Sequence, residues 1–261
     1  MSDPRIGLIG CGRWGSNYLK FGLAGVYDHP TMEGLGEFID SMDALVIATP
    51  TAAHTPVALE CLSRFKPILI EKPIALCFED AELIAAMAEQ DGTVTMVGHL
   101  MLFHPAYLTL ANRLDDDPHW IRAVRTGGTL RTEGPLLALG VHDMAMTMDL
   151  LELHPNGAIE GTRTDDMFFS GWADTTPISI SSTFDGTRER RYLCMSPEGL
   201  YCIDRDELTL DGEFVDEDHP GARIFEPLRA QYNAFVEAVM TGENPVSDAD
   251  FAAACLKGLG Y

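Results

Sequence analysis

The sequence predicts an α/β protein in two parts, a parallel sheet flanked by helices followed by an open, mainly antiparallel sheet. Three observations predict this fold. Short apolar strands alternate with helical stretches over the first hundred residues, a glycine-rich turn follows the first strand, and after residue 120 strands succeed one another through tight turns. With 261 residues, 46% of them hydrophobic, the chain is long enough to bury a core.

The first strand, Arg5–Ile9, runs directly into a glycine-rich turn with the sequence Gly10-Cys11-Gly12-Arg13-Trp14-Gly15. This G-x-G-x-x-G spacing at a strand-to-helix junction is typical of Rossmann-type dinucleotide sites. There the first glycine permits the turn, the second lets a pyrophosphate approach, and the third lets helix and strand pack. An ordinary glycine-rich turn is the alternative interpretation.

The alternation of strands and helices continues from that turn and predicts a doubly wound sheet. The expected elements are a helix at Arg13–Phe21, a strand at Leu23–Tyr27, a helix at Met32–Ser41, a strand at Ala44–Ala48, a helix at Thr55–Ser63, a strand at Pro67–Ile70, a helix at Phe78–Gln90 and a strand at Thr93–Val97. Asp28 follows the second strand, where a carboxylate can bind the ribose hydroxyls of NAD. It can equally be a turn residue before His29-Pro30.

The second part has the pattern of a sheet closed by a helix. We expect strands at Trp120–Thr126, Ile178–Phe184, Arg190–Met195, Gly199–Ile203 and Glu207–Leu210, a helix at Met144–Leu151 and a closing helix at Leu228–Met240. Because one face of such a sheet needs cover, we expect a homodimer or homotetramer.

Composition excludes several classes of protein. Forty acidic residues against 18 basic ones give a net charge of −22, which repels phosphate backbones and argues against nucleic-acid binding. No apolar run is long enough to span a membrane, and the N-terminus lacks a signal-peptide pattern, so no membrane association is expected. The six scattered cysteines include no C-x-x-C, so we expect no metal site and a cytoplasmic location.

Five segments together resemble the Gfo/Idh/MocA family of NAD(P)-dependent sugar and polyol oxidoreductases. They are Gly7–Gly15, Ala48–His54, Ile70-Glu71-Lys72-Pro73, Met96–His99 and Gly140-Val141-His142-Asp143. The resemblance implies a dinucleotide-binding domain over residues 1–100 and a substrate-binding and oligomerisation domain over 101–261, with the last helix packing back. The segments Met96–Pro105 and Arg125–Asp143 are most similar to the branch that oxidises nucleotide-linked sugars.

By this resemblance Lys72 lies beside the nicotinamide and contacts the reacting hydroxyl. An unperturbed lysine has a pKa near ~10.4, which burial and a nearby positive ring would lower. His142 is the second candidate acid or base, since an imidazole can relay the proton. The alternatives are a surface lysine at a strand end and a histidine that packs at a helix start.

The resemblance also implies further binding residues. For the cofactor these are the glycine turn with Asp28, Thr49, Pro50, His54, Glu71, Lys72 and Pro73; for the substrate they are His99, His104, Arg125 and His142. NAD is favoured over NADP because of Asp28. An exposed strand arginine is the alternative for Arg125.

The chain departs from the family pattern in two places. Ala138 stands where many members carry an aspartate four residues before the histidine, and only 15 residues separate Asp28 from Ala44. That length holds one crossover, so one strand and helix of the usual Rossmann half are expected to be missing. These departures favour an alternative function, a catalytically impaired cofactor- or sugar-binding relative.

Overall fold

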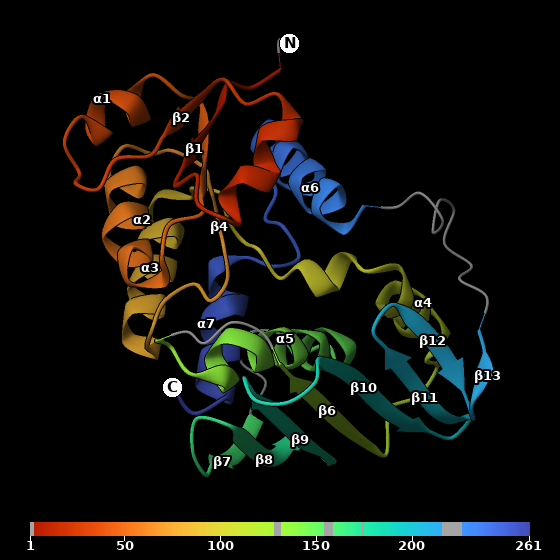
Figure 1. The fold of residues 1–261 in the computed structure, drawn as a ribbon. Helices are drawn as coiled ribbons and strands as arrows, with labels where there is room; N and C mark the ends of the chain where they lie inside the picture. Colours follow the sequence, from red (N-terminus) through yellow and green to blue (C-terminus); the bar gives the residue numbers. More distant parts are fainter. Residues whose placement is uncertain (1–2, 128–131, 154–158, 174, 216–225) are drawn as a thin grey trace. The chain divides into compact units, whose positions relative to one another are not determined.

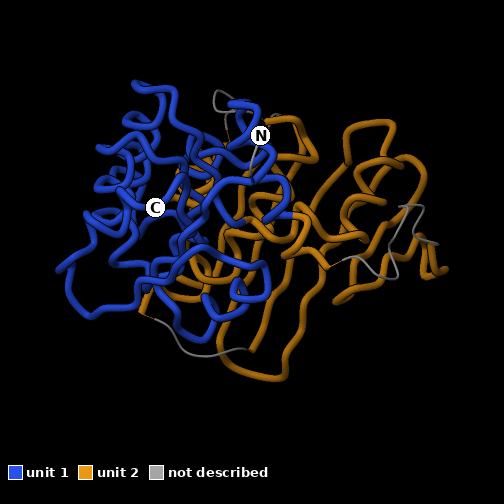
Figure 2. Tube along the Cα trace, turned by 90° about the horizontal axis from the view of Figure 1, so that it is seen from above, with its two compact units in different colours: residues 1–98, 231–253 blue, residues 99–230, 254–261 orange. Residues whose placement is uncertain are grey.

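The computed structural model describes residues 3–127, 132–153, 159–173, 175–215 and 226–261. The chain divides into two compact units, one made of residues 1–98 and 231–253 and the other of residues 99–230 and 254–261 (Figure 2). The unit boundaries therefore fall inside the helices α6 (Pro227–Thr241) and α7 (Ala249–Gly258).

The first unit is a five-stranded sheet in the order β2-β1-β3-β4-β5, in which every pair is parallel. The strands are β1 (Ile6–Ile9), β2 (Gly25–Tyr27), β3 (Ala44–Ile47), β4 (Ile68–Ile70) and β5 (Thr95–Val97). All strands except the edge strand β2 are buried along their whole length. Continuous apolar strands of this kind are expected where helices cover both faces of a sheet.

The helices of this unit are η1 (Gly15–Phe21), α1 (Leu35–Asp40), η2 (Thr51–Ala53), α2 (His54–Leu62) and α3 (Phe78–Asp91). Figure 1 shows α2 and α3 on one side of the sheet and the end of η1 beside α6 on the other. On that second side Phe21 stacks on Tyr232 with ring centroids 4.5 Å apart.

The connection between β2 and β3 is short, as the sequence predicts. Residues 29–43, all of them described, hold α1 and no strand. Four expected elements are shorter than predicted by two residues or more. The helix after the glycine turn is the 3-10 helix η1, β2 begins at Gly25, α1 spans only Leu35–Asp40, and β5 begins at Thr95.

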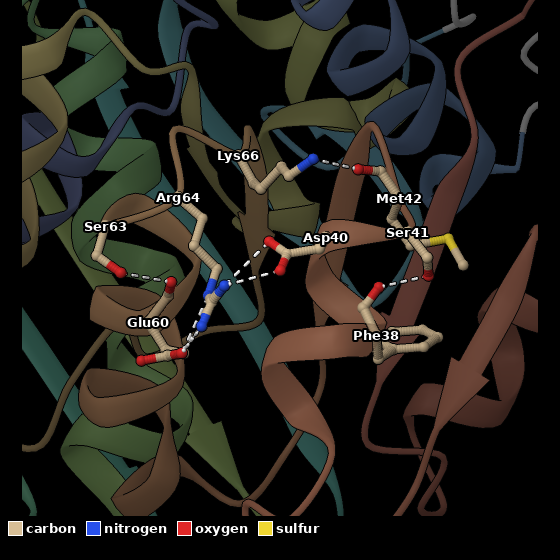
Figure 3. Close-up of polar contacts among 8 residues, drawn as sticks. All are labelled: Phe38, Asp40, Ser41, Met42, Glu60, Ser63, Arg64 and Lys66. Carbon is tan, nitrogen blue, oxygen red and sulfur yellow. Dashed lines mark hydrogen bonds and ion pairs between the residues drawn. The ribbon is translucent and has the colours of Figure 1, made fainter.

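Arg64 joins the helix of the short connection, α1, to the neighbouring helix α2 (Figure 3). The Arg64 guanidinium donates to Asp40 at the end of α1, at 2.9 and 3.0 Å, and to Glu60 in α2, at 2.8 and 3.0 Å. Lys66 Nζ donates to the carbonyl oxygen of Met42 at 2.7 Å. The segment that follows β2 is therefore held on the α2 side by side-chain contacts.

The second unit is an eight-stranded sheet in the order β13-β12-β11-β10-β6-β9-β8-β7. Among the strand pairs that the structure describes in this sheet, only β6 and β9 are parallel. The strands are β6 (Trp120–Thr126), β7 (Ile159–Arg163), β8 (Phe168–Ala173), β9 (Thr176–Thr183), β10 (Glu189–Ser196), β11 (Gly199–Asp204), β12 (Glu207–Leu210) and β13 (Glu213–Phe214). The predicted fold class, a parallel α/β sheet followed by an open, mainly antiparallel one, is confirmed.

Helices lie on one face of this second sheet. They are η3 (Leu100–Phe103), α4 (Pro105–Arg113), η4 (Leu136–Gly140) and α5 (Val141–Leu150). Burial alternates along β9, because every second side chain is on the face that contacts η4. Among the described elements of this unit, none covers the other face (Figure 1).

Candidate functional site

A pocket of about 760 Å³ opens at the carboxyl ends of β1, β2 and β3. It lies where β2 pairs with one side of β1 and β3 with the other. In open parallel sheets ligands bind at such a switch point. The pocket is lined by Ile9, Gly10, Gly12, Arg13, Trp14, Tyr27, Asp28, His29, Pro30, Thr31, Met32, Leu35, Ala48, Thr49, Pro50, Ala53 and Val57.

The three glycines of the turn meet different surroundings. Gly10 has φ +90°, and a Cβ there would lie 2.7 Å from the backbone nitrogen of Thr49. A Cβ at Gly15 would lie 2.1 Å from the Gly10 carbonyl oxygen, so both positions require glycine. A Cβ at Gly12 would meet no atom within 4 Å, which leaves the pocket side of the turn open. The turn thus has the shape that admits a pyrophosphate to the backbone.

Two polar side chains offer further cofactor contacts. Asp28, exposed at the end of β2, accepts a hydrogen bond from the backbone N–H of Cys11 at 3.1 Å. This bond fixes the carboxylate beside the turn, where it can accept from ribose hydroxyls. The buried Thr49 Oγ1 has no hydrogen-bond partner among the described residues. A buried hydroxyl in this condition fits a ligand that brings a partner. An NAD-type dinucleotide therefore fits the residues present.

His54 lies behind the pocket wall and does not line it. Its ring is 1% exposed, with Nδ1 2.9 Å from the Pro73 carbonyl oxygen and Nε2 3.0 Å from that of Thr49. The ring thus joins the loop after β3 to the Lys72-Pro73 segment, whose peptide bond is cis. Half-buried Lys72 lies two residues after the last residue of β4, with Glu71 between them.

Glu71 is also buried and does not line the pocket. Burial raises the pKa of its carboxyl, while hydrogen bonds from Tyr18 and Trp14 oppose the shift. Of the residues predicted to bind cofactor, the structure brings Gly10, Gly12, Arg13, Trp14, Asp28, Thr49 and Pro50 to the pocket lining. The other predicted residues contact the lining or lie beside Lys72. The backbone of Cys11 donates to Asp28, His54 contacts the carbonyl oxygens of Thr49 and Pro73, and Glu71 accepts from Trp14.

The substrate-binding candidates belong to the second unit. Arg125 on β6 is 7% exposed, and its Nε donates to both carboxylate oxygens of Asp143, at 2.8 and 2.7 Å. It is therefore no exposed strand arginine. Half-buried His142 lies in the first turn of α5, next to Asp143. His99 is buried where η3 begins.

His104 shares an acidic partner with Arg190. The Nε2 of His104 lies 3.2 Å from Oδ1 of Asp206, and the Arg190 guanidinium donates to the same oxygen. The register places Arg190 beside Arg125 on neighbouring strands. Sequence reasoning missed Arg190 and Asp206. The signal was available, because Arg190, Tyr192 and Cys194 alternate on the predicted strand and so share one face.

Comparison with known proteins agrees with this geometry. Residues 22–99 match the family model described as "Oxidoreductase family, NAD-binding Rossmann fold", that of the Gfo/Idh/MocA proteins. This segment therefore carries the NAD-binding Rossmann fold of that oxidoreductase family, and the resemblance found in the motifs is confirmed.

Two proteins of known name are similar to this chain in sequence, and for one of them a solved structure can be compared. An alignment of 180 positions is 28% identical to UDP-N-acetylglucosamine 3-dehydrogenase of Acidithiobacillus ferrooxidans and covers 59% of this chain and 56% of that protein. A solved structure of that enzyme superposes with a TM-score of 0.80 at 22% identity, covering 99% of this chain and 96% of the other. A 75-residue stretch, 29% of this chain, is 33% identical to 4-carboxy-2-hydroxymuconate-6-semialdehyde dehydrogenase of Sphingobium sp..

The sequence matches are partial. They span 24% of the Sphingobium protein and 56% of the Acidithiobacillus protein, less than two thirds of either. No helix among the described residues is long and apolar enough to cross a membrane.

Proposed function

We propose that this chain is an NAD-dependent oxidoreductase that transfers a hydride between a nicotinamide cofactor and a sugar hydroxyl. The observation that carries the proposal is the pocket at the switch point of the parallel sheet, lined by Gly12, Asp28 and Thr49. A nucleotide-linked sugar is the substrate class that we favour, because the similarity to UDP-N-acetylglucosamine 3-dehydrogenase extends over 180 aligned positions.

Each residue of the site would have its own role in this reaction. The bound nicotinamide would supply the hydride chemistry. The open side of the glycine turn would hold the pyrophosphate, and the Asp28 carboxylate would accept from the ribose hydroxyls and disfavour the extra phosphate of NADP. Lys72 would take the hydroxyl proton, a role that arginine cannot fill because its guanidinium stays protonated. His142 would relay that proton.

Two of our proposals concern the setting of the protein. We propose a reducing cytoplasmic location, supported by six free cysteines, three of them buried. We also propose a homodimer or homotetramer, supported by the uncovered face of the second sheet.

Substitution of Lys72 tests the catalytic assignment. We expect Lys72→Ala to lower kcat by about 10²–10⁴-fold, the usual contribution of a positioned acid or base, with NAD affinity nearly unchanged. Lys72→Arg should fail equally, whereas the exposed Lys257→Ala should match the parent. Full turnover by Lys72→Ala would contradict the role.

Calorimetric titration with NAD, NADH, NADP and NADPH separates the enzyme from the alternative, a relative that binds without catalysis. That alternative is favoured by Ala138, fully buried in η4, and by the shortened crossover. Dinucleotide binding without turnover on a broad panel of sugars and nucleotide sugars would support it. No binding of any of the four would refute the oxidoreductase and the cofactor-binding relative, and would leave the sugar-binding relative.

A further inference from the structure

A buried hydrogen-bond chain runs under the dinucleotide pocket through Gln231, Tyr18 and Glu71. Gln231 Nε2 donates to the Tyr18 hydroxyl at 3.0 Å, and Tyr18 donates to Glu71 Oε1 at 2.6 Å. Tyr18 and Gln231 are fully buried, and Glu71 is 6% exposed. The chain connects α6, η1 and the end of β4 within one unit.

Trp14 reaches this buried chain from the pocket. Its side chain is 43% exposed and lines the pocket, yet its indole N–H donates to the Glu71 carboxylate. The backbone N–H of Lys72 donates to the same carboxylate. Glu71 therefore receives donors from the glycine turn, from η1 and from the lysine that follows it.

The chemistry of these donors makes Glu71 hard to replace. The oxygens of an ionised carboxylate only accept hydrogen bonds, whereas an indole N–H and a backbone N–H only donate them. A glutamine amide at the same place would turn one acceptor into a donor and leave a buried mismatch. Space is also limited, because a Cβ at Gly98 would lie 3.2 Å from Glu71 Oε2 and 3.3 Å from Gln231 Nε2.

A purely structural role accounts for Tyr18 and Gln231, which pack η1 against α6. It does not account for Trp14, because a half-exposed indole contributes little to a core. What the hydrogen bond to Glu71 does for Trp14 is fix the orientation of one wall of the pocket.

We propose that Glu71 is a positioning residue for the dinucleotide, acting through the indole of Trp14. This inference rests on the proposed function, since it assigns the ligand of the same pocket. The buried carboxylate holds the indole in one orientation before the cofactor arrives, so less ordering remains to be done on binding. Tyr18 and Gln231 hold the carboxylate in turn.

The first test reports on the protein without cofactor. In a Trp120→Phe, Trp172→Phe background Trp14 is the remaining tryptophan, and its acrylamide quenching and anisotropy measure its restraint. We expect Glu71→Gln and Tyr18→Phe to increase quenching and lower anisotropy. Glu79→Gln, at an exposed position in α3, is the matched control and should change neither.

The second test is a double-mutant cycle on NADH affinity. We expect Glu71→Gln to raise the Kd about tenfold, as for the loss of one hydrogen bond to a charged group. Trp14→Phe should raise the Kd similarly. The double variant should bind NADH no more weakly than the weaker-binding single variant, because both substitutions remove the same hydrogen bond between Trp14 and Glu71. The thermal stability of Trp14→Phe should match the parent, since the residue is half exposed.

The outcomes separate the two proposals. If the parent binds no dinucleotide, the proposed function fails, while the quenching of apo Trp14 still tests the restraint. Unchanged quenching in Glu71→Gln, or Kd effects that add in the double variant, would overturn the positioning role. If Glu71→Gln does not fold, the same cycle is made with Tyr18→Phe and Trp14→Phe, and additivity there overturns it equally.

Discussion

The environment of His104 shows how neighbours set the charge of a single residue. The pKa of this imidazole is lowered, chiefly because burial disfavours its charged form, while Asp206 opposes the shift and Arg190 and Arg125 add to it. The side chain is 12% exposed and Asp206 is 71% exposed, so solvent weakens the attraction from the carboxylate. The folded protein therefore favours the neutral form of His104 more than the unfolded chain does.

This shift predicts a pH dependence of stability. The folded state binds the proton of His104 less well than the unfolded chain does. The contribution of His104 to the free energy of unfolding is therefore complete above about pH 6.5, the ordinary histidine pKa, and is lost as the pH falls. We expect His104→Asn to flatten the loss of melting temperature between about pH 6.5 and 5. His119→Asn, at an exposed position, is the control, and an equal slope in His104→Asn and the parent would refute the assignment.

Arg125 illustrates why a site is harder to predict than a strand. The sequence places this arginine correctly on a strand, but its partner Asp143 belongs to a helix 18 residues further on. Asp143 lies in the first turn of α5, where an acid commonly stabilises a helix start, and no local pattern distinguishes that role from a buried ion pair. Tertiary packing decides between them. The substrate-binding role of Arg125 stays a prediction.

Helices and strands could be predicted where their residues follow a clear pattern of apolar and polar positions or of strand-forming residue types. Trp120–Thr126 and Glu207–Leu210 were predicted with the observed bounds. The first is rich in aromatic and β-branched residues, and in the second polar and apolar residues alternate. The edge strand Ile159–Arg163 was missed, since a strand exposed on both faces needs no apolar alternation. The helix Ala249–Gly258 was missed for the opposite reason, because seven of its ten residues are buried and no polar face marks the period.

The crossover helix α1 allows a test of its attachment. A Cβ at Gly36 would lie 2.7 Å from Nη2 of Arg64, so an alanine there displaces the guanidinium that joins α1 to α2. Alanine otherwise favours a helix over glycine by about 0.5–1 kcal/mol. We expect Gly36→Ala to gain that stability in an Arg64→Ala background and much less in the parent, measured by urea unfolding. An equal gain in both backgrounds would show that the contact does not constrain α1.

The whole molecule combines an open sheet face with strong acidity. On the uncovered face of the second unit, Trp172 is 55% and Phe168 38% exposed, and Trp120 and Pro177 line a hollow of about 290 Å³. An uncovered sheet face with exposed aromatic side chains marks an association surface. The net charge of −22 opposes association, because two copies repel each other until salt screens them.

These opposing terms predict an oligomer whose stability rises with salt. We expect light scattering to give a homodimer or homotetramer at micromolar concentration and the dissociation constant to fall as salt increases from low to molar levels. Trp172→Asp should shift the protein toward monomer by about tenfold or more in Kd, since a central aromatic in an interface commonly contributes 2 kcal/mol or more. Phe65→Asp places the same change at a 67% exposed phenylalanine of the first unit and should leave assembly unaffected. A monomer at every salt concentration would mean that this face is not an interface between copies of the chain.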